Sequence, residues 1–145
     1  MPKKRDDRPP LGEFRLDIRV RYAETDAMGY LHHANYPVYF EMGRTEALRA
    51  SGGDYRAMEE DGYFLVIAEM NLKYRRPARF DDVLTVTVRT MDVTPVKLIH
   101  EYLVHRGDEL LTEGRTVLAC VDTGGQIRRM PEDLVDRLTG GEAAG

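Results

Sequence analysis

The clearest pattern in the chain is a strict alternation of apolar and polar residues from Phe14 to Tyr22. Successive side chains of an extended strand point to opposite faces, so this period of two residues predicts a half-buried strand. The apolar face would comprise Phe14, Leu16, Ile18, Val20 and Tyr22. The alternation stops in Ala23–Leu31, where Asp26 and Gly29 indicate a loop.

A helical pattern follows over Asn35–Ala50, because apolar residues recur there at intervals of three and four positions. The apolar stripe comprises Tyr36, Phe40, Gly43, Ala47 and Leu48. Pro37 suits the first turn, where its missing N–H costs least, and Ser51–Gly53 ends the helix. Since Gly43 and Ala47 are small, we expect a sheet to approach the helix closely at these positions.

Four later segments have the alternation or the β-branched composition of strands. They are Tyr63–Tyr74, Asp82–Val93, Val96–His105 and Leu110–Asp122. Hairpin turns are expected at Arg106–Asp108 and Thr123–Gly125, and single helical turns at Asp54–Asp61 and Pro131–Leu138. Because short connections favour antiparallel pairing, the predicted fold is α+β, with a curved antiparallel sheet of about five strands around one long helix.

The composition changes this picture little. A length of 145 residues and an apolar content of 42% suit one domain, which we assign to residues 14–138, with residues 1–13 as a flexible tail. The net charge of -4 does not indicate a nucleic-acid partner. The sequence contains neither a secretory signal nor an apolar run near the roughly 18 residues of a membrane span. The single cysteine, Cys120, is compatible with a reducing compartment, so we expect a cytoplasmic protein.

The loop and the helix start bring a carboxylate close to backbone donors. Asp26 lies shortly before His33, and the first residues of a helix carry free N–H groups that attract negative charge. A reaction that develops an oxyanion needs such a pair. An aspartate before a helix is also a common turn former or N-cap, so the spacing by itself leaves a structural role open for Asp26.

The order of polar residues in this region is distinctive. It reads Tyr22-x-Glu24-Thr25-Asp26-x-x-Gly29, then His33-x-Asn35-Tyr36, then Glu41-x-x-Arg44. Together with Pro77–Asp82 and Arg128–Pro131, this order resembles the 4-hydroxybenzoyl-CoA thioesterase family of hot-dog-fold proteins, and especially the acyl-CoA thioesterase branch found with the Tol-Pal system. The resemblance extends from about Phe14 to Pro131.

This resemblance implies hydrolysis of an acyl-CoA thioester by a homodimer or homotetramer, with the sites at the seam between chains. It implies no cofactor, because coenzyme A is part of the substrate. In related enzymes the aspartate at the position of Asp26 is catalytic, either as a nucleophile or as a general base for water. The position of His33 supplies its backbone N–H to the thioester oxygen, and its imidazole is a further candidate.

The resemblance also implies contacts with the substrate. Tyr22, Thr25 and Asn35 would orient the loop, and the segment Val66, Ile67, Ala68 and Glu69 would line the acyl pocket. The coenzyme phosphates need cations, for which the candidates are Arg75, Arg76, Arg128 and Arg129. Exposed arginines at strand ends are also common without a ligand, so both explanations stay open at this stage.

Other chemistries fit less well. Glu24, Asp26, His32 and His33 lie close in sequence, but adjacent loop histidines do not have the spacing of the common zinc motifs, so no metal is expected. The sequence has no G-x-S-x-G elbow for a serine hydrolase. Cys120 is best explained as a buried, inert thiol.

Several alternatives remain. Glu41 and Glu46 are minor candidates for a catalytic base, because a helical carboxylate serves in a different hot-dog branch; Glu41 could also form an exposed pair with Arg44. The other possible functions are an acyl-carrier-protein thioesterase, a hydratase and a non-catalytic acyl-CoA-binding protein. A pure binder has no need of a carboxylate beside the thioester, so Asp26 separates it from the enzymes.

Overall fold

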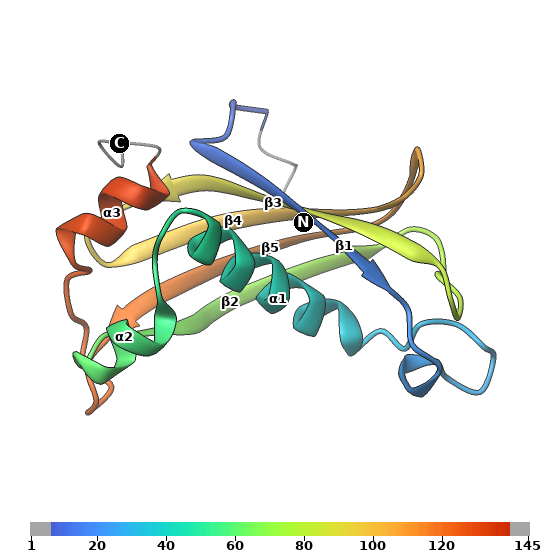
Figure 1. The fold of residues 1–145 in the computed structure, drawn as a ribbon, viewed down its shortest axis with the longest axis horizontal. Helices are drawn as coiled ribbons and strands as arrows, with labels where there is room; N and C mark the ends of the chain where they lie inside the picture. Colours follow the sequence, from blue (N-terminus) through green and yellow to red (C-terminus); the bar gives the residue numbers. More distant parts are fainter. Residues whose placement is uncertain (1–6, 140–145) are drawn as a thin grey trace.

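One long helix lies along the concave face of a curved sheet (Figure 1) in the computed structural model, which describes residues 7–139. The strands are β1 (Gly12–Arg19), β2 (Phe64–Tyr74), β3 (Val83–Val93), β4 (Lys97–Arg106) and β5 (Glu109–Val121). The helices are the 3₁₀ turn η1 (Tyr22–Glu24), α1 (Asn35–Ala50), α2 (Tyr55–Glu60) and α3 (Glu132–Leu138). All five strands pair antiparallel in the order β1-β3-β4-β5-β2, which confirms the predicted α+β architecture. Residues 1–6 of the predicted tail lie outside the described residues, and its predicted end at residue 13 is wrong, because Gly12 and Glu13 belong to β1 and pair with β3.

The expected strand from Phe14 to Tyr22 ends early. β1 ends at Arg19, and Tyr22 lies in η1 instead. The reason is the Glu24 side chain, whose Oε1 accepts a hydrogen bond from the Arg21 N–H at 2.8 Å and closes the turn. The apolar face of the strand therefore does not include Tyr22, which is 77% exposed.

The expected alternation along β2 is also wrong at one point. Pairing of β2 with β5 shifts register between Ile67 and Glu69, so that Ala68 is the extra residue of a bulge. Side chains on the two sides of the bulge therefore do not continue on the same face, so the alternation expected over Tyr63–Tyr74 is interrupted at Ala68.

The core forms between α1 and the sheet. The rings of Phe40 and Tyr102 stack there, with centroids 4.2 Å apart, and Tyr39 is 1% exposed. The close approach predicted at Gly43 is confirmed, because a Cβ at this position would lie 2.6 Å from Cγ2 of Val88. Such a contact distance leaves no room for a larger residue at Gly43.

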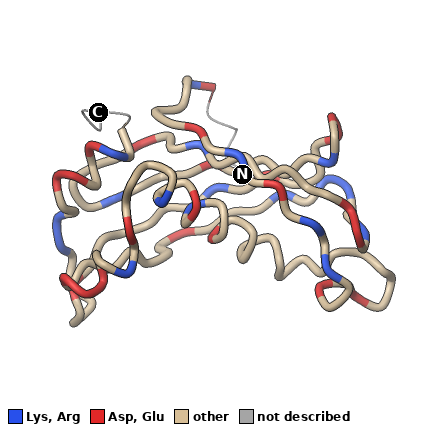
Figure 2. The backbone as a smooth tube through the Cα atoms, in the orientation of Figure 1, with Lys and Arg blue, Asp and Glu red and all other residues tan. Residues whose placement is uncertain are grey.

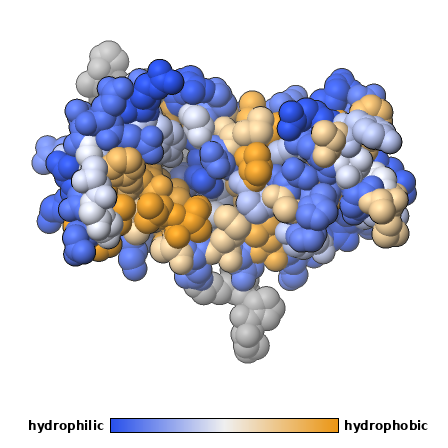
Figure 3. All heavy atoms as spheres, turned by 90° about the horizontal axis from the view of Figure 1, so that it is seen from below, coloured by the Kyte–Doolittle hydropathy of each residue, from blue (hydrophilic) through white to orange (hydrophobic). Residues whose placement is uncertain are grey.

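The outer edge of β2 is one of the two open edges of the sheet, and the other is the outer edge of β1. No other strand among residues 7–139 pairs with the outer edge of β2, and Val66 and Ile67 are each 43% exposed. Viewed from below, apolar side chains gather on this side of the molecule, mainly toward the end that carries α2 (Figure 3). Lys, Arg, Asp and Glu are interspersed along most of the described chain (Figure 2), as the small net charge suggests.

Two further features concern the sequence expectations. Cys120 is buried, and burial raises the pKa of its thiol, in agreement with an inert cysteine. None of the helices found between residues 7 and 139 is long and apolar enough to cross a membrane.

Candidate active site

A pocket of about 300 Å³ lies where the loop before α1 meets the end of β2. Its lining comprises Asp26, Tyr30, Leu31, His33, Tyr36, Tyr74, Arg75, Arg76 and Pro77. Four residues that the sequence singled out thus lie together, namely Asp26, His33, Arg75 and Arg76. Burial raises the pKa of two of the lining phenols, those of Tyr36 and Tyr74, which therefore stay protonated.

Backbone pairing attaches the loop to the connection between β2 and β3. Tyr30 forms an isolated β-bridge with Arg79, and the Leu31 N–H donates to the Ala78 carbonyl at 2.8 Å. The Arg79 guanidinium also lies over the Tyr30 ring, 4.8 Å from its centroid. The loop that carries Asp26 is therefore attached to the connection between β2 and β3.

The Asp26 side chain has one oxygen engaged and one available. Oδ1 accepts hydrogen bonds from the N–H groups of Met28 at 2.9 Å and Tyr30 at 3.1 Å. No hydrogen bond among residues 7–139 uses Oδ2. Gly29 completes the turn with a φ of 79°, which glycine adopts without strain. The turn-forming and the chemical roles of Asp26 are thus compatible, because the turn orients the carboxylate and leaves one oxygen exposed.

The start of α1 leaves one backbone donor available beside this carboxylate. The Ala34 N–H donates to Nδ1 of His32 at 3.2 Å, the Asn35 N–H to the His32 carbonyl at 3.0 Å, and the Tyr36 N–H to the His33 carbonyl at 3.3 Å. The His33 N–H has no acceptor among the described residues. A free amide at the positive end of a helix is suited to stabilising an oxyanion.

The His33 side chain lies against aromatic rings. Its imidazole stacks on that of His32, with centroids 4.4 Å apart, and meets the edge of Tyr74 at 6.2 Å. The Tyr74 hydroxyl donates to the His33 carbonyl at 3.3 Å. Tyr74 therefore connects the end of β2 to the helix start, a role that the sequence pattern did not reveal.

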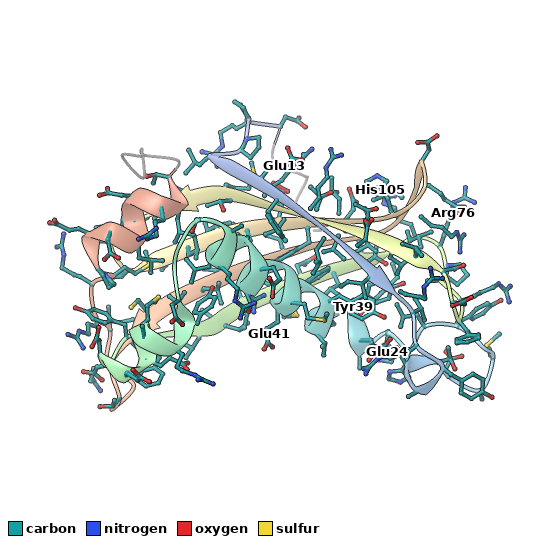
Figure 4. All side chains as sticks on the ribbon, viewed as in Figure 1. Glu13, Glu24, Tyr39, Glu41, Arg76 and His105 are labelled. Carbon is teal, nitrogen blue, oxygen red and sulfur yellow. The ribbon has the colours of Figure 1, made fainter. Side chains whose placement is uncertain are left out.

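Glu24 is the main residue that the sequence reasoning missed. Its side chain is 7% exposed, and Oε1 accepts hydrogen bonds from the Arg21 N–H and from the Tyr39 hydroxyl, both at 2.8 Å. Figure 4 shows Glu24 and Tyr39 meeting between the loop and α1. The backbone carbonyl of Glu24 accepts hydrogen bonds from the His32 N–H at 2.8 Å and from Nδ2 of Asn35 at 3.0 Å. One buried residue thus joins η1, the loop and α1.

Burial by itself would raise the pKa of Glu24, but the hydrogen bonds from Arg21 and Tyr39 outweigh it and lower the pKa below the usual value. Conversely, burial and the bond to this carboxylate raise the pKa of Tyr39. The carboxylate is therefore ionised and the phenol protonated at neutral pH. The signal in the sequence was the acidic residue three positions after Arg21, which forms a capping box.

The other predicted loop residues do not line the pocket. The Thr25 hydroxyl donates to the Tyr22 carbonyl at 2.7 Å, and Asn35 donates to loop carbonyls. Tyr22 packs edge-on against Phe80, with centroids 5.5 Å apart. Their role in orienting the loop stays a prediction.

The remaining predicted residues do not line the pocket of their own chain. They are Arg128, Arg129 and Val66–Glu69. Arg128 donates to the Gly62 carbonyl at 3.0 Å and lies 3.7 Å over the Tyr63 ring, before the start of β2. The pocket is at the other end of β2, a distance on the order of 35 Å for a strand of this length. Exposed Arg129 follows Arg128, and Val66, Ile67, Ala68 and Glu69 lie along the exposed edge of β2.

The two arginines at the pocket have carboxylate partners in the free chain. Arg75 makes a double contact with Oε2 of Glu113, at 3.0 and 2.8 Å, and Arg76 lies 3.2 Å from Glu109. Exposed pairs of this kind are weak, about 0–1 kcal/mol, so a phosphate can displace them.

The minor candidates are not part of this pocket. Glu41 is exposed, and Glu46 forms an ion pair with Arg49 on the same helix. The expected pair of Glu41 with Arg44 is absent from the ion pairs of the described residues, since Arg44 turns toward Tyr102 instead. No group of three or more His, Cys, Asp or Glu side chains within residues 7–139 is arranged to hold a metal ion.

The Glu24 network can be tested by Glu24→Gln. We expect a loss of about 1.5–3 kcal/mol of unfolding free energy at pH 7, the usual range for hydrogen bonds to a charged group. Because folding lowers this pKa, the stabilisation is present above pH 4.5 and declines as the pH falls through the folded-state pKa. Urea unfolding from pH 3 to 7 should therefore show the two proteins converging in acid. Glu41→Gln, on the exposed face of α1, is the matched control, and a constant difference at every pH would contradict the assignment.

Comparisons with known proteins identify the family and the fold. The model of the thioesterase-like superfamily matches residues 20–138. The acyl-CoA thioester hydrolase YbgC of Escherichia coli is 33% identical over 124 residues, covering 84% of this chain and 92% of that protein. Two crystal structures have the same fold. The hypothetical protein TT1821 from Thermus thermophilus has a TM-score of 0.82 at 38% identity, with coverage of 88% of this chain and 98% of its own. DHNA-CoA thioesterase from Staphylococcus aureus has a TM-score of 0.84 at 25% identity, with coverage of 88% and 89%. The chain therefore belongs to the thioesterase-like superfamily and has its hot-dog fold.

Proposed function

We propose that this thioester hydrolase cleaves acyl-CoA to a free acid and coenzyme A, with Asp26 as the catalytic carboxylate. The observation that carries the proposal is the meeting, in one pocket, of the available oxygen of Asp26 with the available N–H of His33 at the start of α1. The relative named as an acyl-CoA thioester hydrolase supports coenzyme A as the thiol. The finer resemblance to the Tol-Pal-associated branch is part of the same proposal.

In the proposed reaction, the thioester carbonyl lies between the two groups. Asp26 either attacks the carbonyl carbon, forming a mixed anhydride that water then cleaves, or removes a proton from an attacking water. In both routes the carbonyl oxygen becomes an oxyanion, which accepts a hydrogen bond from the His33 N–H and is stabilised by the helix dipole. The oxyanion then collapses, the C–S bond breaks and the coenzyme leaves as a thiolate. This thiolate takes up the proton held by Asp26 in the general-base route, or a proton from water in the nucleophilic route. Neither route requires a metal or a cofactor.

The Asp26 carboxylate and the two arginines at the pocket distinguish the proposed function from the alternatives. A non-catalytic acyl-CoA-binding protein gains nothing from an ionised carboxylate with an exposed oxygen beside a thioester. A carrier-protein thioesterase would use the same carboxylate and amide, but it would not require cations for the nucleotide phosphates. Arg75 and Arg76 at the pocket mouth therefore favour coenzyme A.

The open edge of β2 favours assembly. A long unpaired edge with exposed apolar residues is normally paired or covered, so we infer a homodimer in which two β2 strands continue the sheet, with a homotetramer as a further possibility. Antiparallel pairing about the middle of β2 would place Phe64 of one chain beside Tyr74 of the other. It would thereby bring Arg128 and Arg129 of a second copy to the pocket, and Val66–Glu69 to the seam.

The chemical role of Asp26 is tested by Asp26→Asn, which keeps the shape of the side chain and removes the charge. We expect kcat to fall by at least roughly 10²-fold, the lower end for a positioned proton-transfer group. His33→Ala retains the backbone N–H and should therefore have a smaller effect. Steady-state hydrolysis of an acyl-CoA provides the measurement, with Asp136→Asn at an exposed position of α3 as the charge control.

Each variant is first checked for folding by circular dichroism and for assembly by sedimentation. Near-normal turnover by folded Asp26→Asn would refute the mechanism. A defect of His33→Ala as large as that of Asp26→Asn would transfer the role of the amide to the imidazole.

The seam is tested by mixing two defective chains. Arg128 and Arg129 contact the substrate far from the reacting carbonyl, so replacing both by Gln should raise KM and leave kcat nearly unchanged. If each site takes Asp26 from one chain and the arginines from the other, an Asp26→Asn chain co-assembled with a doubly substituted chain contains one fully native site.

Such a heterodimer, isolated with two affinity tags, should have about half the native kcat and the native KM, since one of its two sites is intact. A heterodimer that retains the raised KM would place all of these residues in a single-chain site, and a monomeric native protein at micromolar concentration would exclude the seam altogether.

A further inference from the structure

A second cavity, of about 230 Å³, lies beneath the start of β1, between the C-terminal half of α1 and the sheet. Glu13, which Figure 4 labels, borders it on β1. Arg44 and Ala47 contribute from α1, Thr90 from β3 and His100 from β4. The cavity shares no lining residue with the pocket around Asp26, so it is a separate compartment of the fold.

His100 has an unsatisfied ring nitrogen in this region. Its side chain is 2% exposed, and Nδ1 is buried without a hydrogen-bond partner in the described part of the chain. Buried polar atoms in folded proteins are nearly always paired, so an orphaned nitrogen beside a cavity points to a bound polar molecule. Burial, together with the nearby Arg44, lowers the pKa of His100 to about 3. The imidazole is therefore neutral at physiological pH, with one donor and one acceptor nitrogen.

Arg44 places a positive charge at the same point. Its Nη1 donates to the Tyr102 hydroxyl at 3.0 Å, and this hydroxyl is 2.7 Å from the hydroxyl of Thr116. Arg44 makes no ion pair with any residue between 7 and 139. A half-buried guanidinium has five donors, and only one of them is used here. A cation withdrawn from water normally has an anionic partner, and none is present within the described fold.

The surroundings favour an anion of single charge. Among the described lining residues Glu13 is the sole carboxylate, and it lies near Arg15 at 3.8 Å and Arg89 at 3.6 Å. Burial raises the pKa of Tyr55 to about 12, so its hydroxyl is protonated and can donate. A second guanidinium, that of Arg137, also lines the cavity, but it donates to the Ser51 carbonyl at 2.6 Å and lies 3.9 Å from a carboxylate oxygen of Asp133. Arg44 is therefore the guanidinium of the described lining without a carboxylate partner, and with the neutral donors it matches one negative charge better than the two of a phosphate dianion.

The size and the apolar part of the lining limit the ligand further. Phe14, Val88 and Leu138 contribute apolar surface next to the polar end. The volume is below the roughly 300–1,000 Å³ of pockets for drug-sized ligands, so it excludes an acyl-CoA. A carboxylate with a few carbon atoms or a single ring satisfies both the charge and the volume.

We propose that this cavity is a binding site for a small organic monocarboxylate. The carboxylate pairs with the Arg44 guanidinium and accepts hydrogen bonds from the His100 ring and the Tyr55 hydroxyl, and the hydrocarbon part packs against the apolar lining. The inference is independent of the catalytic role of Asp26, because none of the residues that carry it belongs to the catalytic pocket.

The test is calorimetric titration of the full chain with butyrate and benzoate at pH 7, compared with benzamide and inorganic phosphate. Saturable binding of a carboxylate is expected, with the uncharged benzamide at least about 10-fold weaker, because the ionic hydrogen bonds are lost. NMR shifts of the His100 and Tyr55 rings should saturate with the same affinity. Tighter binding of phosphate, or no saturable binding of either carboxylate, would overturn the proposal.

Variants then locate the site. Arg44→Gln should weaken carboxylate binding by at least about 10-fold, whereas Arg49→Gln, which removes a charge from the same helix outside the cavity, should not change it. Ala47→Leu fills the cavity and should abolish binding with Arg44 intact, which keeps the proposal testable if Arg44→Gln does not fold. Asp26→Asn should bind as the native protein does. Unchanged binding in folded Ala47→Leu, or loss of binding in Asp26→Asn, would contradict the location.

Discussion

The candidate site depends on one buried carboxylate. Glu24 connects the Arg21 amide, the Tyr39 hydroxyl and the backbone of the loop at His32. A buried charge is stable only when its hydrogen bonds are satisfied, so the loop cannot move from α1 without exposing or unpairing this group. The position of Asp26 relative to the helix start follows from this constraint. In the proposed reaction, the preorganisation that a developing oxyanion requires would therefore come from a residue that does not line the pocket.

Local sequence patterns predicted most of the fold. The spacing of apolar residues predicted α1 with its observed ends, and Gly43 indicated the close packing against the sheet. The bulge at Ala68 was not predictable in the same way, because an alternating pattern cannot record where a partner strand shifts register. Turn chemistry likewise ended β1 before Tyr22, since a side-chain hydrogen bond competed successfully with the apolar alternation.

The sequence predicted the part of the site whose residues lie close together along the chain. Asp26 and His33 are close in sequence and meet in the folded chain. Arg128 lies at the far end of β2, and only the proposed dimer would bring it to the pocket, an arrangement that the sequence of one chain does not specify. The direction of Arg44 was also undetermined, because the spacing of Glu41 and Arg44 permits an ion pair but does not exclude the Tyr102 hydroxyl as a partner.

The most direct measurement of the central claim is a crystal structure with an acyl-CoA analogue in which a methylene group replaces the thioester sulfur. This ketone cannot be hydrolysed at the carbonyl, so the bound geometry can be observed. The carbonyl oxygen should lie about 3 Å from the backbone nitrogen of His33, with the carbonyl carbon facing the available oxygen of Asp26. A carbonyl bound away from this loop, or one whose oxygen accepts no hydrogen bond from the His33 amide, would contradict the account.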